Sequence, residues 1–152
     1  MMTTILEKMG GSRAHAARLR DFLHDVAGST ACEEADRVRE ALILLPGGGS
    51  DGASGLDYPR IEAMLECGAT LNAVLEIVGP DAALMLSRGS NAVCLATVVP
   101  AGAPEEAITD GPTLALAVLA GHVSGVVAHL ERGDVEPETP EMPAIPLSMR
   151  LH

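Results

Sequence analysis

Residues 82–99 of this 152-residue chain have the sequence AALMLSRGSNAVCLATVV. Two short apolar runs, 82–87 and 92–99, flank the polar sequence RGSN at 88–91. Glycine and asparagine near the middle supply the positive φ angles that a tight hairpin needs. The β-branched residues of the second run favour a strand. We therefore predict a two-stranded antiparallel β-hairpin. The patterns on both sides of it predict helices, so the expected fold class is α+β.

A long apolar helix is expected after the hairpin. The sequence TDGP at 109–112 is typical of a helix start, and the helix should run to about Glu131 and end at Gly133. Residues 113–130 carry no formal charge, which reaches the lower length limit of a membrane span. Two histidines and a serine interrupt this run, and its flanks show no excess of positive charge. We therefore predict a buried core or interface helix.

Helices are also expected before the hairpin. Apolar residues recur at helical spacing and define four segments, about 4–27, 30–45, 57–67 and 70–78. Gly10 and Gly11 mark a potential break in the first. The chain then divides into a helical hairpin (1–45), a Gly-rich linker (46–56), an α-ββ-α unit (57–132) and a Pro-rich acidic tail (133–152). The tail is expected to be extended or disordered, because its prolines prevent a helix.

Composition excludes several classes of function. The chain has 10 Lys and Arg against 21 Asp and Glu, which gives a net charge of −11, and its only aromatic residues are Phe22 and Tyr58. Nucleic-acid binding needs a basic groove and aromatic stacking platforms, so we expect no nucleic-acid partner. The absence of a polybasic segment argues against a membrane surface as partner. The first residues do not resemble a signal peptide, so the expected location is cytoplasmic.

Residues with potential chemistry are few and poorly spaced. The three cysteines are far apart and form no C-x-x-C pair, so neither a disulfide framework nor a zinc site is expected. His122 and His129 are seven residues apart, whereas helical metal ligands are usually three or four apart. Ser124 is not part of a G-x-S-x-G motif. We therefore predict no catalytic, cofactor-binding or metal-binding residue.

Small residues form the clearest pattern within the last helix. Ala117, Gly121 and Gly125 are four residues apart, and Ser124 lies beside them. Glycine within a helix costs about 1 kcal/mol relative to alanine, and close approach of another backbone is the usual compensation. We predict that this small-residue stripe packs against a second copy of the helix or against a neighbouring element. The expected outcome is a homodimer, or tight docking of residues 4–45 onto residues 57–132.

Residues 108–117, ITDGPTLALA, together with the helix–hairpin–helix order of residues 57–132, resemble the small ABA-sandwich domains of phages and prophages. This resemblance implies an accessory protein of undefined biochemistry, with no catalytic residues to transfer. The function expected first is therefore a non-enzymatic, self-associating accessory or interaction protein.

Two alternatives belong to other classes. Residues 47–52 match G-x-G-x-x-G, which would serve a small-ligand or nucleotide-binding protein if a strand preceded them. The acidic charge would serve a decoy that binds a basic partner, provided that the acids form one dense face.

Overall fold

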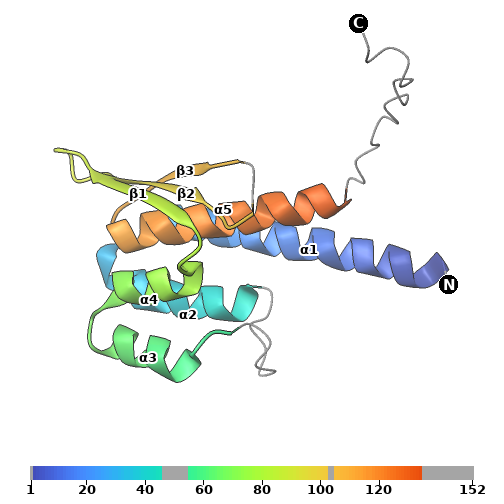
Figure 1. Ribbon diagram of the computed structural model, residues 1–152, viewed down its shortest axis with the longest axis horizontal. Helices are drawn as coiled ribbons and strands as arrows, with labels where there is room; N and C mark the ends of the chain where they lie inside the picture. Colours follow the sequence, from blue (N-terminus) through green and yellow to red (C-terminus); the bar gives the residue numbers. More distant parts are fainter. Residues whose placement is uncertain (1, 46–54, 103–104, 135–152) are drawn as a thin grey trace, which may run out of the picture.

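The computed structural model describes residues 2–45, 55–102 and 105–134, with only the helical backbone described for residues 2–9 and 134. The α+β class is confirmed. The predicted acidic tail beyond residue 134 and most of the predicted linker (46–54) lie outside the described residues. The elements in chain order are α1 (Met2–Ala27), the 3-10 helix η1 (Ala31–Glu33), α2 (Glu34–Leu44), α3 (Tyr58–Glu66), α4 (Thr70–Val78), β1 (Ala83–Arg88), β2 (Cys94–Val99), β3 (Ala107–Gly111) and α5 (Leu114–Asp134) (Figure 1).

The helices before the sheet begin and end close to the expected positions. The first is continuous through Gly10 and Gly11, so no break occurs there. At the start of η1, the carboxylate of Glu33 accepts a hydrogen bond from the backbone N–H of Thr30 at 3.3 Å and forms part of a capping box. Asp57 caps α3 by accepting from the backbone N–H of Arg60 at 3.2 Å. These local signals suffice because each involves residues within one turn.

The sheet has three antiparallel strands in the order β1-β2-β3. The predicted hairpin is confirmed, with Met85 opposite Thr97. Its turn differs from the prediction, because the positive φ lies at Ala92 and not at the glycine or the asparagine of RGSN. The prediction of only two strands is wrong, because residues 107–111 pair with β2 and place Ile108 opposite Thr97. Three of them, Thr109 to Gly111, belong to the TDGP sequence that predicts the start of the last helix. The helix begins instead at Leu114, where the Thr113 hydroxyl accepts from the backbone N–H of Leu116 at 3.1 Å.

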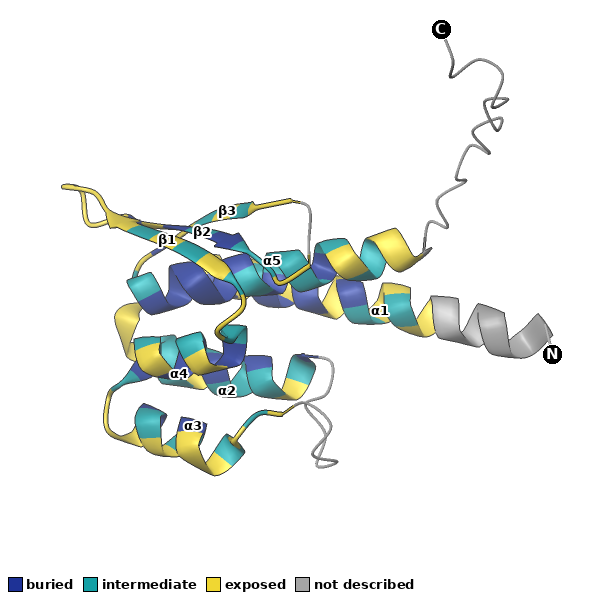
Figure 2. Ribbon diagram, viewed as in Figure 1, coloured by how far each residue is buried: buried dark blue, intermediate teal, exposed yellow. Residues whose placement is uncertain are grey.

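The helix α5 lies at the centre of the fold. The sheet covers one side of it, α1 runs beside it, and α2 and α4 lie below with α3 outermost (Figure 1). All seven residues from Ala115 to Gly121 are consequently buried (Figure 2). By length and composition residues 114–133 could cross a membrane, but half of the window is buried inside the protein. This is the arrangement of a core helix.

The first two helices dock tightly onto the rest of the chain. Leu19, Phe22 and Val26 of α1 belong to the same apolar core as the buried residues of α5. Ion pairs add links at the surface: Arg20 pairs with Glu131 between α1 and α5, and Arg39 pairs with Glu62 between α2 and α3. Docking of residues 4–45 onto residues 57–132, one of the two arrangements expected, is therefore what the structure shows.

Candidate functional site

The small-residue stripe of α5 faces the chain's own sheet. A β-carbon added at Gly121 would lie 2.5 Å from Cγ2 of Val98 and 3.1 Å from Oγ1 of Thr109. One added at Gly125 would lie 2.8 Å from Cγ of Pro100. The glycines therefore allow β2, β3 and the loop after β2 to approach the helix backbone closely. The element that fills this space within the chain is a sheet and not a second helix.

The other two members of the stripe have different surroundings. Ala117 is fully buried, and its carbonyl oxygen accepts a 2.7 Å hydrogen bond from the hydroxyl of Thr109. Gly111 at the end of β3 completes this contact, since a β-carbon there would lie 2.8 Å from the backbone nitrogen of Ala117. Ser124 is half-buried. The stripe thus joins helix and sheet and contains no reactive arrangement.

The outer face of the sheet, turned away from α5, is the first candidate surface. Along β2 the inward residues are buried while Leu95 remains 45% exposed. On the flanking strands Met85 is 72% exposed and Ile108 is 66% exposed. Their register places Met85, Thr97 and Ile108 in one row across the three strands. Among the described residues, no helix covers this face, so apolar side chains lie on both sides of the sheet (Figure 2).

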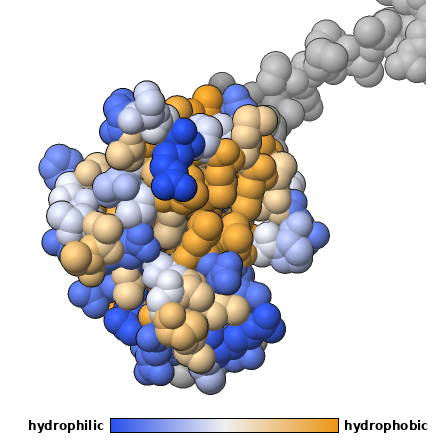
Figure 3. All heavy atoms as spheres, turned by 90° about the vertical axis from the view of Figure 1, so that its left-hand side faces the viewer, coloured by the Kyte–Doolittle hydropathy of each residue, from blue (hydrophilic) through white to orange (hydrophobic). Residues whose placement is uncertain are grey.

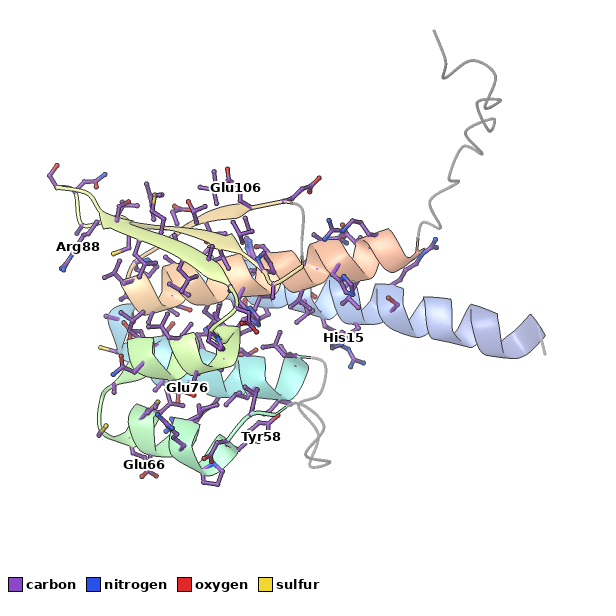
Figure 4. The ribbon with its side chains drawn as sticks, viewed as in Figure 1. His15, Tyr58, Glu66, Glu76, Arg88 and Glu106 are labelled. Atoms are coloured by element: carbon purple, nitrogen blue, oxygen red, sulfur yellow. The ribbon has the colours of Figure 1, made fainter. Side chains whose placement is uncertain are left out.

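A pocket of about 360 Å³ is the second candidate site. It lies below the hairpin, at the end of the molecule where α2, α4 and α5 all begin (Figure 1). The first turns of these helices line it through Glu34, Thr70 and Leu114. Figure 3 views this end and shows apolar surface at its centre with hydrophilic side chains around it. Arg88 projects from the end of β1 below the hairpin (Figure 4) and also lines the pocket.

The polar residues of this pocket come from the starts of helices and from the hairpin. Thr70 is 8% exposed, and its hydroxyl forms no hydrogen bond with the described residues. The helix that it begins, α4, has no side-chain cap, in contrast to α3 and α5. Neither Thr70 nor Arg88 was singled out from the sequence, because no local motif marks them and only the fold brings them together.

The other candidate residues do not assemble into a site. His122 is partly buried, and this desolvation lowers its pKa, whereas His129 on the same helix is exposed. Cys32 and Cys67 are exposed, Cys94 is buried, and all three are free. Within the described ranges, no group of three or more His, Cys, Asp or Glu residues is arranged to hold a metal ion. The glycine sequence at 47–52 lies outside the described residues.

Comparison with known proteins gives no match: no family model, curated protein or solved structure is similar to this chain. The resemblance of residues 57–132 to phage-type ABA-sandwich domains therefore stays a prediction.

Proposed function

We propose that this protein is a non-enzymatic, cytoplasmic interaction protein that self-associates through the outer face of its sheet. The observation that supports this is the row formed by Met85, Thr97 and Ile108, whose two flanking apolar side chains are mostly exposed. Contiguous apolar surface on a soluble protein commonly marks an interaction site. Because β2 and β3 of the same chain pack against the small-residue stripe of α5, a second copy cannot bind there, and we place the interface on the sheet.

A second copy of the same face is a suitable partner. A twofold axis along β2, in the plane between two such faces, brings Met85 of one copy over Ile108 of the other. Leu95 then lies over its own counterpart. Asp110, which is in register with Leu95 and Ser87, comes over Ser87 of the other copy. No acid on this face therefore meets another acid, although the chain is strongly acidic overall.

The size of the face sets the expected strength of the dimer. Three strands about 4.8 Å apart and about 20 Å long give the outer face of the sheet an area of roughly 300 Å². Each partner of a standard stable interface buries about 800 Å². We therefore expect a reversible dimer whose population depends on protein concentration, not an obligate one.

Sedimentation velocity across the micromolar range tests this proposal. The wild-type protein should shift from monomer to dimer with increasing concentration, and Ile108→Lys should remain monomeric, because it places an ammonium group opposite the apolar Met85 of the other copy. The matched control is Ile43→Lys. Ile43 is 77% exposed on α2, away from the sheet, so this variant should dimerise like the wild type. A monomeric wild type, or equal loss of dimer in both variants, overturns the proposal.

A further inference from the structure

We propose that residues 145–151 of this chain dock as a fourth strand on the free edge of β1, with their apolar side chains in the groove between β1 and α4. This edge is separate from the outer face of the sheet, and docking there does not require self-association. The open edge, its half-covered apolar side chains and an alternating sequence in the tail support this assignment.

The edge of β1 is open to a further strand. Among the described residues, β1 pairs with β2 alone. The backbone N–H of Gly89 donates to the carbonyl oxygen of Val93, and the backbone groups of an antiparallel strand point alternately toward and away from its partner. Those of Leu84 and Leu86 therefore point to the free edge. Residues 83–87 carry neither a charge nor a proline, so nothing in the sequence opposes strand pairing there.

The inner side of β1 is less well covered than that of β2. The inward residues of β2 are buried, with Cys94 3% exposed and both Ala96 and Val98 0% exposed. In contrast, Leu84 and Leu86 pack against the core but are only half-buried. Part of their apolar surface therefore remains in contact with solvent, and a further strand beside β1 would cover it.

The helix α4 forms the other wall of the groove. Its residues Leu71, Leu75 and Val78 are half-buried and share one side of the helix. Leu71 lines the pocket below the hairpin together with Arg88 at the end of β1. The chain passes from the end of α4 into β1 within a few residues, so helix and strand run in opposite directions along the groove. Figure 3 shows apolar surface at this end of the molecule.

The sequence beyond residue 144 has the pattern of a strand with one apolar face. Apolar side chains occupy every second position of the run Ile145, Pro146, Leu147, Ser148, Met149, Arg150 and Leu151. This period of two is typical of a half-buried strand. The apolar side of the segment therefore matches the groove, and its other side suits solvent.

One antiparallel register satisfies both the backbone and the side chains. Placing Leu147 opposite Leu86 sets residues 145–150 against the six residues of β1. Because opposite residues of an antiparallel hydrogen-bonded pair share a face, Leu147 and Met149 then bond to the edge and also face the groove. The nitrogen of Pro146 points away from β1, where an edge strand tolerates proline.

The chain is long enough for this docking. In this register the added strand begins beside Arg88, which lines one pocket with Leu114, the first residue of α5. The helix α5 has 21 residues, which corresponds to a length of about 31 Å. From Asp134 to Ile145 the extended chain spans up to about 36 Å. The segment can therefore reach β1 of its own chain.

Amide hydrogen exchange of Leu84 and Leu86, measured by NMR on the full chain, tests the docking. The wild type should protect both amides. Leu147→Asp should make them exchange at least about tenfold faster, because a carboxylate in the apolar groove is unfavourable. The matched control Ser148→Asp adds the same charge on the solvent side and should keep the protection. Fast exchange in the wild type, or equal exchange in the two variants, refutes the proposal.

A disulfide test identifies the chain to which the added strand belongs. The exposed cysteines are first removed by Cys32→Ser and Cys67→Ser. Leu86→Cys combined with Leu147→Cys should then form a disulfide within one chain, because the Cα atoms of such a pair lie about 5.5 Å apart. Leu86→Cys combined with Ser148→Cys is the matched control and should stay reduced. A disulfide between two chains, or equal oxidation of both pairs on a non-reducing gel, overturns the proposal.

Discussion

The hydroxyl of Thr109 on β3 donates a 2.7 Å hydrogen bond to the carbonyl oxygen of Ala117 on α5. This contact fixes the third strand against the central helix. The two residues are only eight apart, yet a strand end, a turn and the helix start lie between them. The same part of α5 also accepts Gly111 and Val98 at close range. The contact is therefore central to the helix–sheet packing.

Replacing Thr109 by valine removes this hydrogen bond at nearly constant shape. We expect Thr109→Val to lower the free energy of unfolding by about 1 kcal/mol, the usual net value of one hydrogen bond. Urea denaturation followed by circular dichroism measures it. The control is Thr97→Val, because Thr97 lies on the neighbouring strand but on the outer face. Equal stability changes in the two variants would contradict the role assigned to the Thr109 hydroxyl.

Gly121 should not tolerate alanine, although alanine is the better helix former. The added methyl group would lie 2.5 Å from Cγ2 of Val98, so strand and helix must separate. We expect Gly121→Ala to destabilise the protein by about 1–3 kcal/mol, as overpacked cores do. In contrast, Gly11→Ala in α1, where nothing lies within 4 Å, should be neutral or stabilising by up to about 1 kcal/mol. Thermal and urea unfolding of both variants compare the two sites. A Gly121→Ala protein as stable as the wild type would exclude this close packing.

The ion pair between α2 and α3 should make stability depend on pH. Nη2 of Arg39 lies 2.7 Å from Oε1 of Glu62, and this hydrogen bond lowers the pKa of Glu62 below 4.5. A carboxyl whose pKa is lowered by folding stabilises the folded state above its unfolded pKa. That contribution disappears as the pH falls through the folded pKa. The stability advantage of the wild type over Glu62→Gln should therefore be present at neutral pH and absent in strong acid.

Salt and a neighbouring acid provide the checks for this pair. Both side chains are partly exposed, so added salt should reduce the advantage. Glu66→Gln on the same helix changes the charge equally, but Glu66 has no ion pair among the described residues. That variant should not reproduce the pH effect. A pH-independent difference between the wild type and Glu62→Gln would contradict the pairing.

His122 should also make the folded protein less stable as the pH falls, for a different reason. Burial lowers its pKa below 6.5 because it disfavours the charged imidazolium. The unfolded chain therefore binds more protons than the folded one in mildly acidic solution, and stability should fall as the pH drops through about 6.5. His122→Gln should reduce this dependence, whereas His129→Gln, at an exposed position on the same helix, should retain it. Urea unfolding at several pH values between neutral and mildly acidic conditions measures the effect. A His122 ring that titrates above 6.5 by NMR would refute it.

Much of the secondary structure follows from local signals. The helices expected to begin near residues 30 and 57 begin there in the structure, and the RGSN sequence lies at the end of β1 and in the turn that follows it. These predictions succeed because the deciding contacts join residues close in the chain. The third strand was missed because residues 107–111, AITDG, contain only two β-branched residues and end in a sequence typical of a turn. They become a strand through pairing with β2.

The sequence by itself determined the α+β class, the buried nature of the last helix and the presence of small residues along one of its sides. Those features depend on residue type and on periodicity within single segments. Only the tertiary structure decided what the stripe contacts, since Gly121 meets Val98 and Thr109 across the helix–sheet interface. It also decided that Glu34, Thr70, Arg88 and Leu114 line one pocket. The physical reason is that such contacts join segments tens of residues apart, and chain folding, not local pattern, sets their distances.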